Sequence, residues 1–115
     1  MNAYHDESIL EKNLSSERVF DGLILHIDHL TNRLPNGKTA PREVARHIGA
    51  SAVLPIDDRG NVLLVRQYRA PIDRVTMEIP AGKLDFKGED RLEAAKRELR
   101  EETGASAKKW THLTD

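Results

Sequence analysis

Three glutamates, Glu98, Glu101 and Glu102, crowd the short stretch "KRELREETGA". Residues three and four positions apart share a face of a helix, so these carboxylates would repel one another there. Negative charge near the C-terminal end of a helix also opposes the helix dipole. A cation held between the carboxylates would remove the repulsion, and Mg²⁺ prefers such oxygen ligands together with water and substrate phosphates. The stretch therefore points to a divalent metal site, for Mg²⁺ or alternatively Mn²⁺.

Arg97 stands among these glutamates, four residues before Glu101 and four after Glu93. At this spacing it can brace carboxylates of its own helix and orient the metal ligands without contacting a substrate. Lys96 and Arg100 also alternate with the glutamates, as they would on any exposed helix laced with ion pairs. From the charge pattern alone, both the metal site and the solvated helix face remain open.

The element that must carry the glutamates is predicted to be a helix over residues 90–103. Leu92, Ala95 and Leu99 recur at helical spacing and define its buried stripe. Gly104 then ends the helix as a C-cap. The glutamates consequently lie on a neighbouring face of the same helix.

The segments before the helix are predicted to be strands. Apolar and polar residues alternate over residues 19–34, and the hairpin signal Asn36–Gly37 should return the chain as a second strand through residues 43–48. Residues 50–69 hold two apolar runs joined by "DDRGN", which predicts another hairpin that is more buried. "VTMEIPAGK" predicts a strand that leads into a glycine loop, and "ASAKKWTHLTD" after the helix predicts the start of another strand.

Composition limits the classes of function. A chain of 115 residues, 38% hydrophobic, is the size of one modest domain. Its 18 basic and 19 acidic residues are interspersed, and the net charge of -1 gives no basic surface for nucleic acid. There is no cysteine, which excludes disulfides, thiolate metal sites and thiol nucleophiles. No export signal or membrane-spanning apolar run is recognisable, so we expect a cytoplasmic protein with no membrane partner.

The stretch from Gly82 to Ala105 resembles the Nudix box. That motif is a glycine, five residues, a glutamate, seven residues, and then Arg-Glu, an apolar residue, any residue, Glu-Glu, any residue, Gly and an apolar residue. From Glu89 to Ala105 every position of the motif is matched. Between Gly82 and Glu89 there are six residues where the motif has five, so Phe86–Lys87 holds a one-residue insertion. We expect this insertion to shift Gly82 relative to the helix.

The flanking segments are similar to the ADP-ribose pyrophosphatase branch of the Nudix hydrolases. "VRQYR" and "EIPAGK" precede the box, and "LPNGK" and "REV" lie further upstream. The resemblance implies an α/β protein: a Nudix-type α/β/α sandwich with a mixed sheet, whose N-terminal portion would be residues 49–115, with the box at 82–105. Residues 1–48 would form an antiparallel β region that dimerises. Because family members continue with further strands, a closing helix and a loop that often carries another catalytic glutamate, the resemblance also implies that this chain is truncated at its C-terminus.

The same resemblance implies an activity: Mg²⁺-dependent hydrolysis of the diphosphate bond of a nucleoside diphosphate linked to another moiety. With ADP-ribose the products would be AMP and ribose 5-phosphate. The resemblance implies three sets of site residues. The catalytic residues would be Glu98, Glu101, Glu102 and Arg97. The metal would be bound by the same three glutamates with the backbone carbonyl of Ala81, and the substrate by Arg42, Arg69 and Glu78. For the two substrate arginines, ordinary exposed charge on strands is the alternative. The alternative for the whole chain is a catalytically incomplete fragment that binds metal or nucleotide, or only self-associates as a homodimer.

Overall fold

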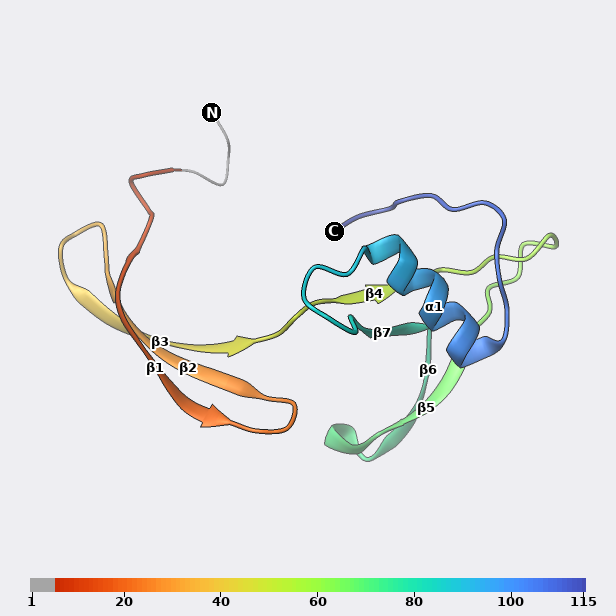
Figure 1. Cartoon of the computed structure of the whole chain (residues 1–115), viewed down its shortest axis with the longest axis horizontal. Helices are drawn as coiled ribbons and strands as arrows, with labels where there is room; N and C mark the ends of the chain where they lie inside the picture. The colour runs from red at the N-terminus through yellow and green to blue at the C-terminus, as the bar shows by residue number, and fades with distance from the viewer. Residues whose placement is uncertain (1–5) are drawn as a thin grey trace. The chain divides into compact units, whose positions relative to one another are not determined.

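The computed structural model describes residues 6–115, so residues 1–5 of the predicted N-terminal β region lie outside the described part. The chain divides into two compact units that join between His47 and Ile48 (Figure 1). The first unit contains only strands, whereas the second contains strands and a helix. The predicted α/β class with an N-terminal antiparallel β region is thereby confirmed.

The first unit is a three-stranded antiparallel sheet with its strands in chain order. Its strands are β1 (Lys12–Asp21), β2 (His26–Arg33) and β3 (Thr39–Arg46). The predicted turn at Asn36–Gly37 connects β2 to β3 and is confirmed. Gly37 has a φ of 83°, a left-handed conformation that glycine adopts without steric cost, and the N–H of Leu34 donates to the carbonyl of Lys38 at 2.7 Å.

The prediction of one strand over residues 19–34 is wrong, because the chain turns between β1 and β2. The N–H of Gly22 donates to the carbonyl of Leu25 at 2.7 Å and closes this turn. Apolar residues continue through the turn, and Leu23 in it is 98% exposed. Apolar alternation therefore did not mark the turn, and β1, whose first half is polar, was missed.

The second unit is built from short antiparallel strand pairs and one helix. Its elements are β4 (Ala50–Ala52), β5 (Val65–Arg69), the 3₁₀ turn η1 (Ala70–Ile72), β6 (Arg74–Glu78), β7 (Ala81–Lys83) and α1 (Arg91–Thr103). β4 pairs with β7, and β5 pairs with β6. The helix lies against β4 and β7, so these three elements position the candidate site (Figure 1).

The hairpin predicted over residues 50–69 is only partly present. Its "DDRGN" turn forms, since the N–H of Asp57 donates to the carbonyl of Asn61 at 2.9 Å, and Ile56 bridges Val62. The strands on either side of the turn do not pair with each other, because β4 pairs with β7 and β5 pairs with β6. Among its apolar residues, the prediction that this hairpin is buried holds only for Val53, which is 8% exposed; Leu54, Ile56, Val62, Leu63 and Leu64 are exposed, and within residues 6–115 no α-helix besides α1 is present to cover them.

The helix prediction is confirmed, but its buried stripe is displaced. Ala95 and Leu99 are buried as expected, whereas Leu92 is 44% exposed. The buried residues of α1 are Ala94, Ala95, Glu98 and Leu99. The face turned toward the strands therefore includes one of the candidate metal ligands.

The segment after the helix packs as an irregular chain, so the prediction of a strand there is wrong. Trp110 and Ala105 pack against the core cluster formed by Val53, Ala95 and Leu99. The indole N–H of Trp110 donates to the carbonyl of Ala107 at 3.1 Å. A strand needs a neighbouring strand to pair with. Within residues 6–115, none of the strands pairs with the segment after the helix.

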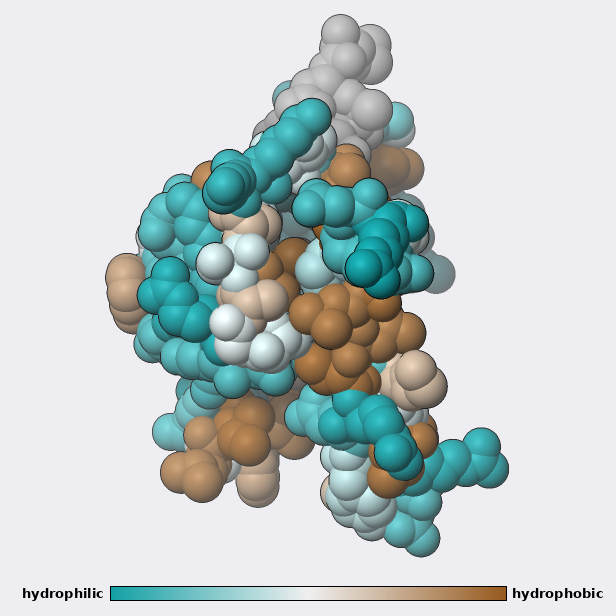
Figure 2. Space-filling view, turned by 90° about the vertical axis from the view of Figure 1, so that its right-hand side faces the viewer, coloured by the Kyte–Doolittle hydropathy of each residue, from teal (hydrophilic) through white to brown (hydrophobic). Residues whose placement is uncertain are grey.

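Much apolar surface of the second unit is uncovered. Figure 2 shows the side on which the 57–61 turn lies, where brown apolar side chains gather into a patch. Exposed large apolar residues of this unit include Leu54, Ile56, Val62, Leu63, Leu64, Tyr68, Ile72, Val75 and Met77. None of the helical segments within residues 6–115 combines the length and apolar character needed to cross a membrane.

Candidate active site

Packing of Ala95 and Leu99 with Val53 sets the rotational phase of α1, and two caps set its ends. At the start, the carboxylate of Asp90 accepts the N–H of Glu93 at 2.9 Å. At the end, Gly104 takes a left-handed conformation and its N–H donates to the carbonyl of Arg100 at 2.8 Å. In this phase Glu98 is only 8% exposed, which is rare for a carboxylate unless it is paired.

Gly82 on β7 lies directly against the Glu98 carboxylate. A Cβ placed on Gly82 would come closer than 3.0 Å to the carboxyl carbon and to both oxygens of Glu98. Because the backbone of Gly82 is outside the left-handed region, close approach, and not turn geometry, accounts for the glycine. Gly82 therefore lies beside the helix.

Glu102 reaches the neighbouring residue of the same strand. Its Oε2 accepts the N–H of Ala81 at 3.1 Å. The strand is held in place from the other side, since Ala81 pairs with Ala52 and the N–H of Val53 donates to the carbonyl of Pro80 at 2.8 Å. Two glutamates one helical turn apart therefore meet two successive residues of β7.

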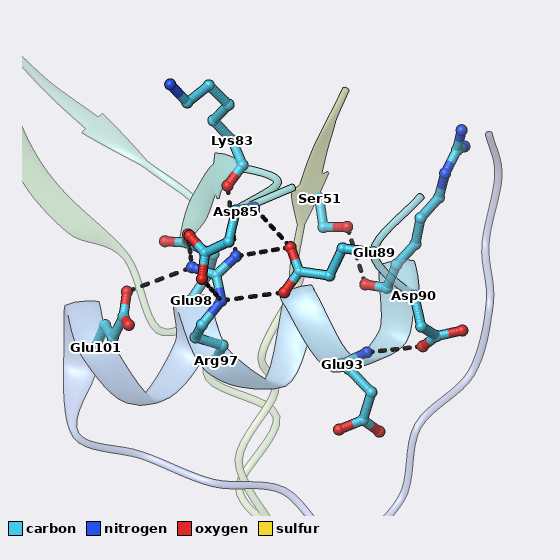
Figure 3. Close-up of polar contacts among 10 residues, drawn as sticks. Ser51, Lys83, Asp85, Glu89, Asp90, Glu93, Arg97, Glu98 and Glu101 are labelled. Atoms are coloured by element: carbon cyan, nitrogen blue, oxygen red, sulfur yellow. Dashed lines mark hydrogen bonds and ion pairs between the residues drawn. The ribbon is translucent and has the colours of Figure 1, made fainter. Parts of the chain in front are cut away.

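Arg97 is the hub of the charge network. Figure 3 shows its guanidinium surrounded by four carboxylates, those of Asp85, Glu89, Glu98 and Glu101. Nη1 lies 2.8 Å from Glu98, Nε 3.1 Å from Asp85 and Nη2 3.2 Å from Glu89. The hydrogen bond to Glu89 is the largest of the interactions that raise the pKa of Arg97 above its already high ordinary value. Arg97 is thus permanently charged. Its contact with Glu98 gives this buried acid a partner of opposite charge.

Helical spacing predicted only part of this network. Arg97 lies 3.6 Å from Glu101, as the spacing suggests, but Glu93 pairs with Lys96 at 2.9 Å instead. Asp85 and Glu89 were missed as partners of Arg97, because both precede the helix. The motif itself contained a signal, since Glu89 is its first glutamate.

Glu89 also organises the loop before the helix. Its Oε2 accepts the N–H of Asp85 at 2.7 Å. This backbone hydrogen bond, followed by the contact with Arg97, lowers the pKa of Glu89 below its ordinary value of 4.5. The side chain is nearly buried and ionised, so it ties the loop to the helix.

The predicted substrate residues fall into two places. Arg69 and Glu78 form an ion pair within the β5–β6 pair, with Nη2 and Oε2 2.9 Å apart. Arg42 belongs to β3 of the first unit, where both oxygens of Glu11 hold its guanidinium. Each predicted substrate arginine therefore presents its donors to a carboxylate.

The donor set fits a hard divalent cation. Glu98 and Glu102 place carboxylates beside Ala81–Gly82, and Glu101 adds an exposed carboxylate on the same helix. Among residues 6–115, no three His, Asp or Glu side chains are gathered in the arrangement that would hold a metal ion. Here Arg97 binds Glu98, and the N–H of Ala81 binds Glu102. A cation would exchange these contacts for its own.

Comparison with known proteins gives consistent matches. Residues 45–115 match the family model described as NUDIX domain. The chain is 45% identical over 94% of its length to an ADP-ribose pyrophosphatase of Bacillus subtilis, and 42% identical over 90% to one of Mycobacterium tuberculosis. It is 46% identical over 82% of its length to a methanol dehydrogenase activator of Bacillus methanolicus.

A solved structure agrees with these sequence relatives. The crystal structure of an ADP compounds hydrolase superimposes with a TM-score of 0.75 at 28% identity, covering 86% of this chain and 54% of that one. The three sequence relatives are covered over 58%, 50% and 50% of their own lengths. The chain thus spans about half the length of the curated relatives it matches.

Proposed function

Because the chain belongs to the Nudix family, we propose that it hydrolyses the diphosphate bond of a nucleoside diphosphate linked to another moiety. ADP-ribose is the proposed substrate, with AMP and ribose 5-phosphate as products. The observation that carries the proposal is the contact of Glu98 and Glu102 with successive residues of β7. Two relatives named as ADP-ribose pyrophosphatases, at 45% and 42% identity, support the choice of substrate.

The chemistry follows from the charge of the substrate. Bound Mg²⁺, or Mn²⁺, would neutralise the diphosphate and acidify a water molecule. Glu98 and Glu102, with the carbonyl of Ala81, are the residues that would hold the ion. Glu101 is the exposed carboxylate of the group and would complete the ligand set or accept the proton of the attacking water. Arg97 would keep Glu98 in its orientation.

Arg69 and Arg42 are proposed to contact the phosphates of the substrate. A guanidinium binds phosphate and carboxylate oxygens with the same fork of N–H donors. The ion pairs with Glu78 and Glu11 accordingly hold each fork in a defined orientation until a phosphate competes for it.

The test is the release of AMP and ribose 5-phosphate when the full chain is incubated with ADP-ribose and Mg²⁺, alongside other nucleoside diphosphate derivatives. Glu102→Gln removes one charge and should abolish turnover while leaving the far-ultraviolet circular dichroism unchanged. Glu93→Gln makes the same chemical change on the solvent side of the helix, where Glu93 pairs with Lys96, and should retain activity. Full activity of Glu102→Gln would overturn the assignment.

We also propose that the first unit mediates a homodimer. Phe20, Leu23, Ile24 and Leu25 are exposed in and beside the β1–β2 turn, and β1 is an edge strand. Exposed apolar groups and open edges are surfaces that other chains cover. Sedimentation velocity should give twice the 13.0 kDa of one chain, and a monomeric mass would contradict the proposal.

A second candidate function is favoured by the apolar surface of the second unit. With so many apolar side chains uncovered, the chain would self-associate through them. In the other form of this alternative, the chain binds metal or nucleotide without turnover. Equilibrium dialysis of ADP-ribose beside the product assay separates the two candidates, because binding without products selects the second.

A further inference from the structure

The loop between β7 and α1 makes a turn at residues 86–89. Leu84, at the start of the loop, is buried, whereas Phe86 is 62% exposed. The N–H of Glu89 donates to the carbonyl of Phe86 at 3.2 Å, and Gly88 between them has a φ of 84°. The turn therefore carries the exposed Phe86, while Leu84 and Glu89 on either side of it are buried or nearly so.

Asp85 makes two contacts that point inward from this loop. Its backbone N–H donates to Oε2 of Glu89 at 2.7 Å, and its Oδ2 lies 3.1 Å from Nε of Arg97. Nε also donates a hydrogen bond to Oε1 of Glu89 at 3.3 Å, so Asp85 and Glu89 share this group. Because the donors of a guanidinium lie in one plane, its partners at Nε restrict where the two Nη groups point. Nη1 is the atom that holds Glu98, at 2.8 Å.

We infer that Asp85 is a positioning residue that acts on Glu98 through Arg97. By sharing the charge of Arg97 with Glu89, Asp85 weakens the hold of the guanidinium on Glu98. Glu98 is then released more readily to a cation. The inference rests on the proposed function for the cation, but the geometry of Asp85, Arg97 and Glu98 exists in its absence.

A simpler explanation must be separated from this one. Asp85 is an acid whose side chain is 59% exposed, and any acid near a metal site attracts cations through its charge. That attraction is long-range and is screened by salt, whereas a contact-mediated effect is not. Glu93 is the matched control, because it is an exposed acid on α1 that pairs with Lys96 instead of Arg97.

The first experiment needs neither metal nor activity. The Nε–H signal of Arg97 is followed by nitrogen-15 NMR in the metal-free full chain. Asp85→Asn should shift this signal and hasten its exchange with water, Asp85→Glu should restore it, and Glu93→Gln should leave it in place. An Arg97 signal that is unmoved in Asp85→Asn would overturn the inference.

The second experiment titrates Mn²⁺ into the full chain, with free Mn²⁺ measured by electron paramagnetic resonance. Asp85→Asn should weaken Mn²⁺ binding about fivefold, the upper range for a partly exposed ion pair, and Asp85→Glu should restore it. The loss should persist at high salt, and Glu93→Gln should show none. Unchanged binding in Asp85→Asn, loss that vanishes with salt, or no binding to the wild-type chain would each overturn the inference. If Asp85→Asn weakens Mn²⁺ binding as expected but the wild-type chain does not hydrolyse ADP-ribose, the inference is supported and the proposed function is refuted.

Discussion

Both units of the molecule carry ion-pair networks, but the networks differ in the exposure of their arginines. In the first unit Arg18 and Arg46 flank Asp28 on the sheet; the two arginine side chains are 43% and 52% exposed, around an acid that is 13% exposed. In the second, the side chain of Arg97 is 21% exposed and its partner Glu98 is almost fully buried. Exposed pairs contribute little to stability, whereas a buried acid that loses its partner is strongly penalised. The comparison teaches that charge pattern alone does not distinguish the two networks, while the burial of the arginine side chains does.

The largest contrast is expected between Glu98→Gln and Glu17→Gln. Glu17 is an exposed acid on β1, and Glu98 is the buried acid that faces β7. Loss of a metal-binding carboxylate removes several kcal/mol of transition-state stabilisation, so Glu98→Gln should lower the rate of ADP-ribose hydrolysis about 10³-fold. The rate for Glu17→Gln should equal that of the wild-type chain. Equal rates for both variants would remove the functional distinction between the units.

Arg97→Lys and Arg46→Lys compare an arginine that contacts four carboxylates with one that is paired with Asp28 alone among the ion pairs of residues 6–115. Lysine keeps the charge but loses the planar fork, which matters where one guanidinium serves several carboxylates. Arg97→Lys should reduce Mn²⁺ affinity or activity about 10–100-fold, the usual cost of disturbing the residues around metal ligands. Arg46→Lys should change neither quantity. Isothermal calorimetry with Mn²⁺ and product release measure the two effects, and a silent Arg97→Lys would contradict the role of the fork.

Gly82→Ala and Gly37→Ala compare two glycines that are needed for different reasons. A Cβ at Gly82 overlaps the carboxylate of Glu98, and overpacking of this kind costs about 1–3 kcal/mol. A Cβ at Gly37 meets nothing within 4 Å but forces a side chain onto a left-handed backbone, at a cost of about 1 kcal/mol. Urea unfolding should show a loss for both variants. Only Gly82→Ala should also impair activity, and an active Gly82→Ala would indicate that Glu98 moves freely.

The smallest effect is expected from Asp28→Asn. Hydrogen bonds from Arg18 and then from Arg46 hold the pKa of Asp28 below its ordinary value of 3.8. A lowered pKa in the folded state stabilises the protein above the ordinary value, and this stabilisation is lost as the pH falls through the folded pKa. Urea unfolding should therefore separate wild type from Asp28→Asn slightly at pH 7, with the gap closing in acid. A gap that widens in acid would contradict the sign of the pKa shift.

Local signals were predicted well, and pairings were not. The C-cap Gly104 and the turn at Gly37 depend on residues close together in sequence, so composition and spacing revealed them; the sequence prediction places the N-cap Asp90 in the helix as its first residue. The pairing of β4 with β7 joins residues that are separated by the whole β5–β6 segment, and no local pattern encodes it. The turn at Gly22 was hidden because apolar residues run through it.

The amino-acid sequence alone specifies the helix, its three glutamates and the motif that identifies the Nudix family, because these are properties of neighbouring residues in fixed register. Packing decides the rest. Only the folded chain buries Glu98 against Gly82, turns Glu102 to Ala81 and directs Arg97 toward Asp85 and Glu89. These contacts cross from a helix to a strand and a loop, so they depend on how the elements meet. The packing of helix, strand and loop therefore arranges the acidic residues into a defined site.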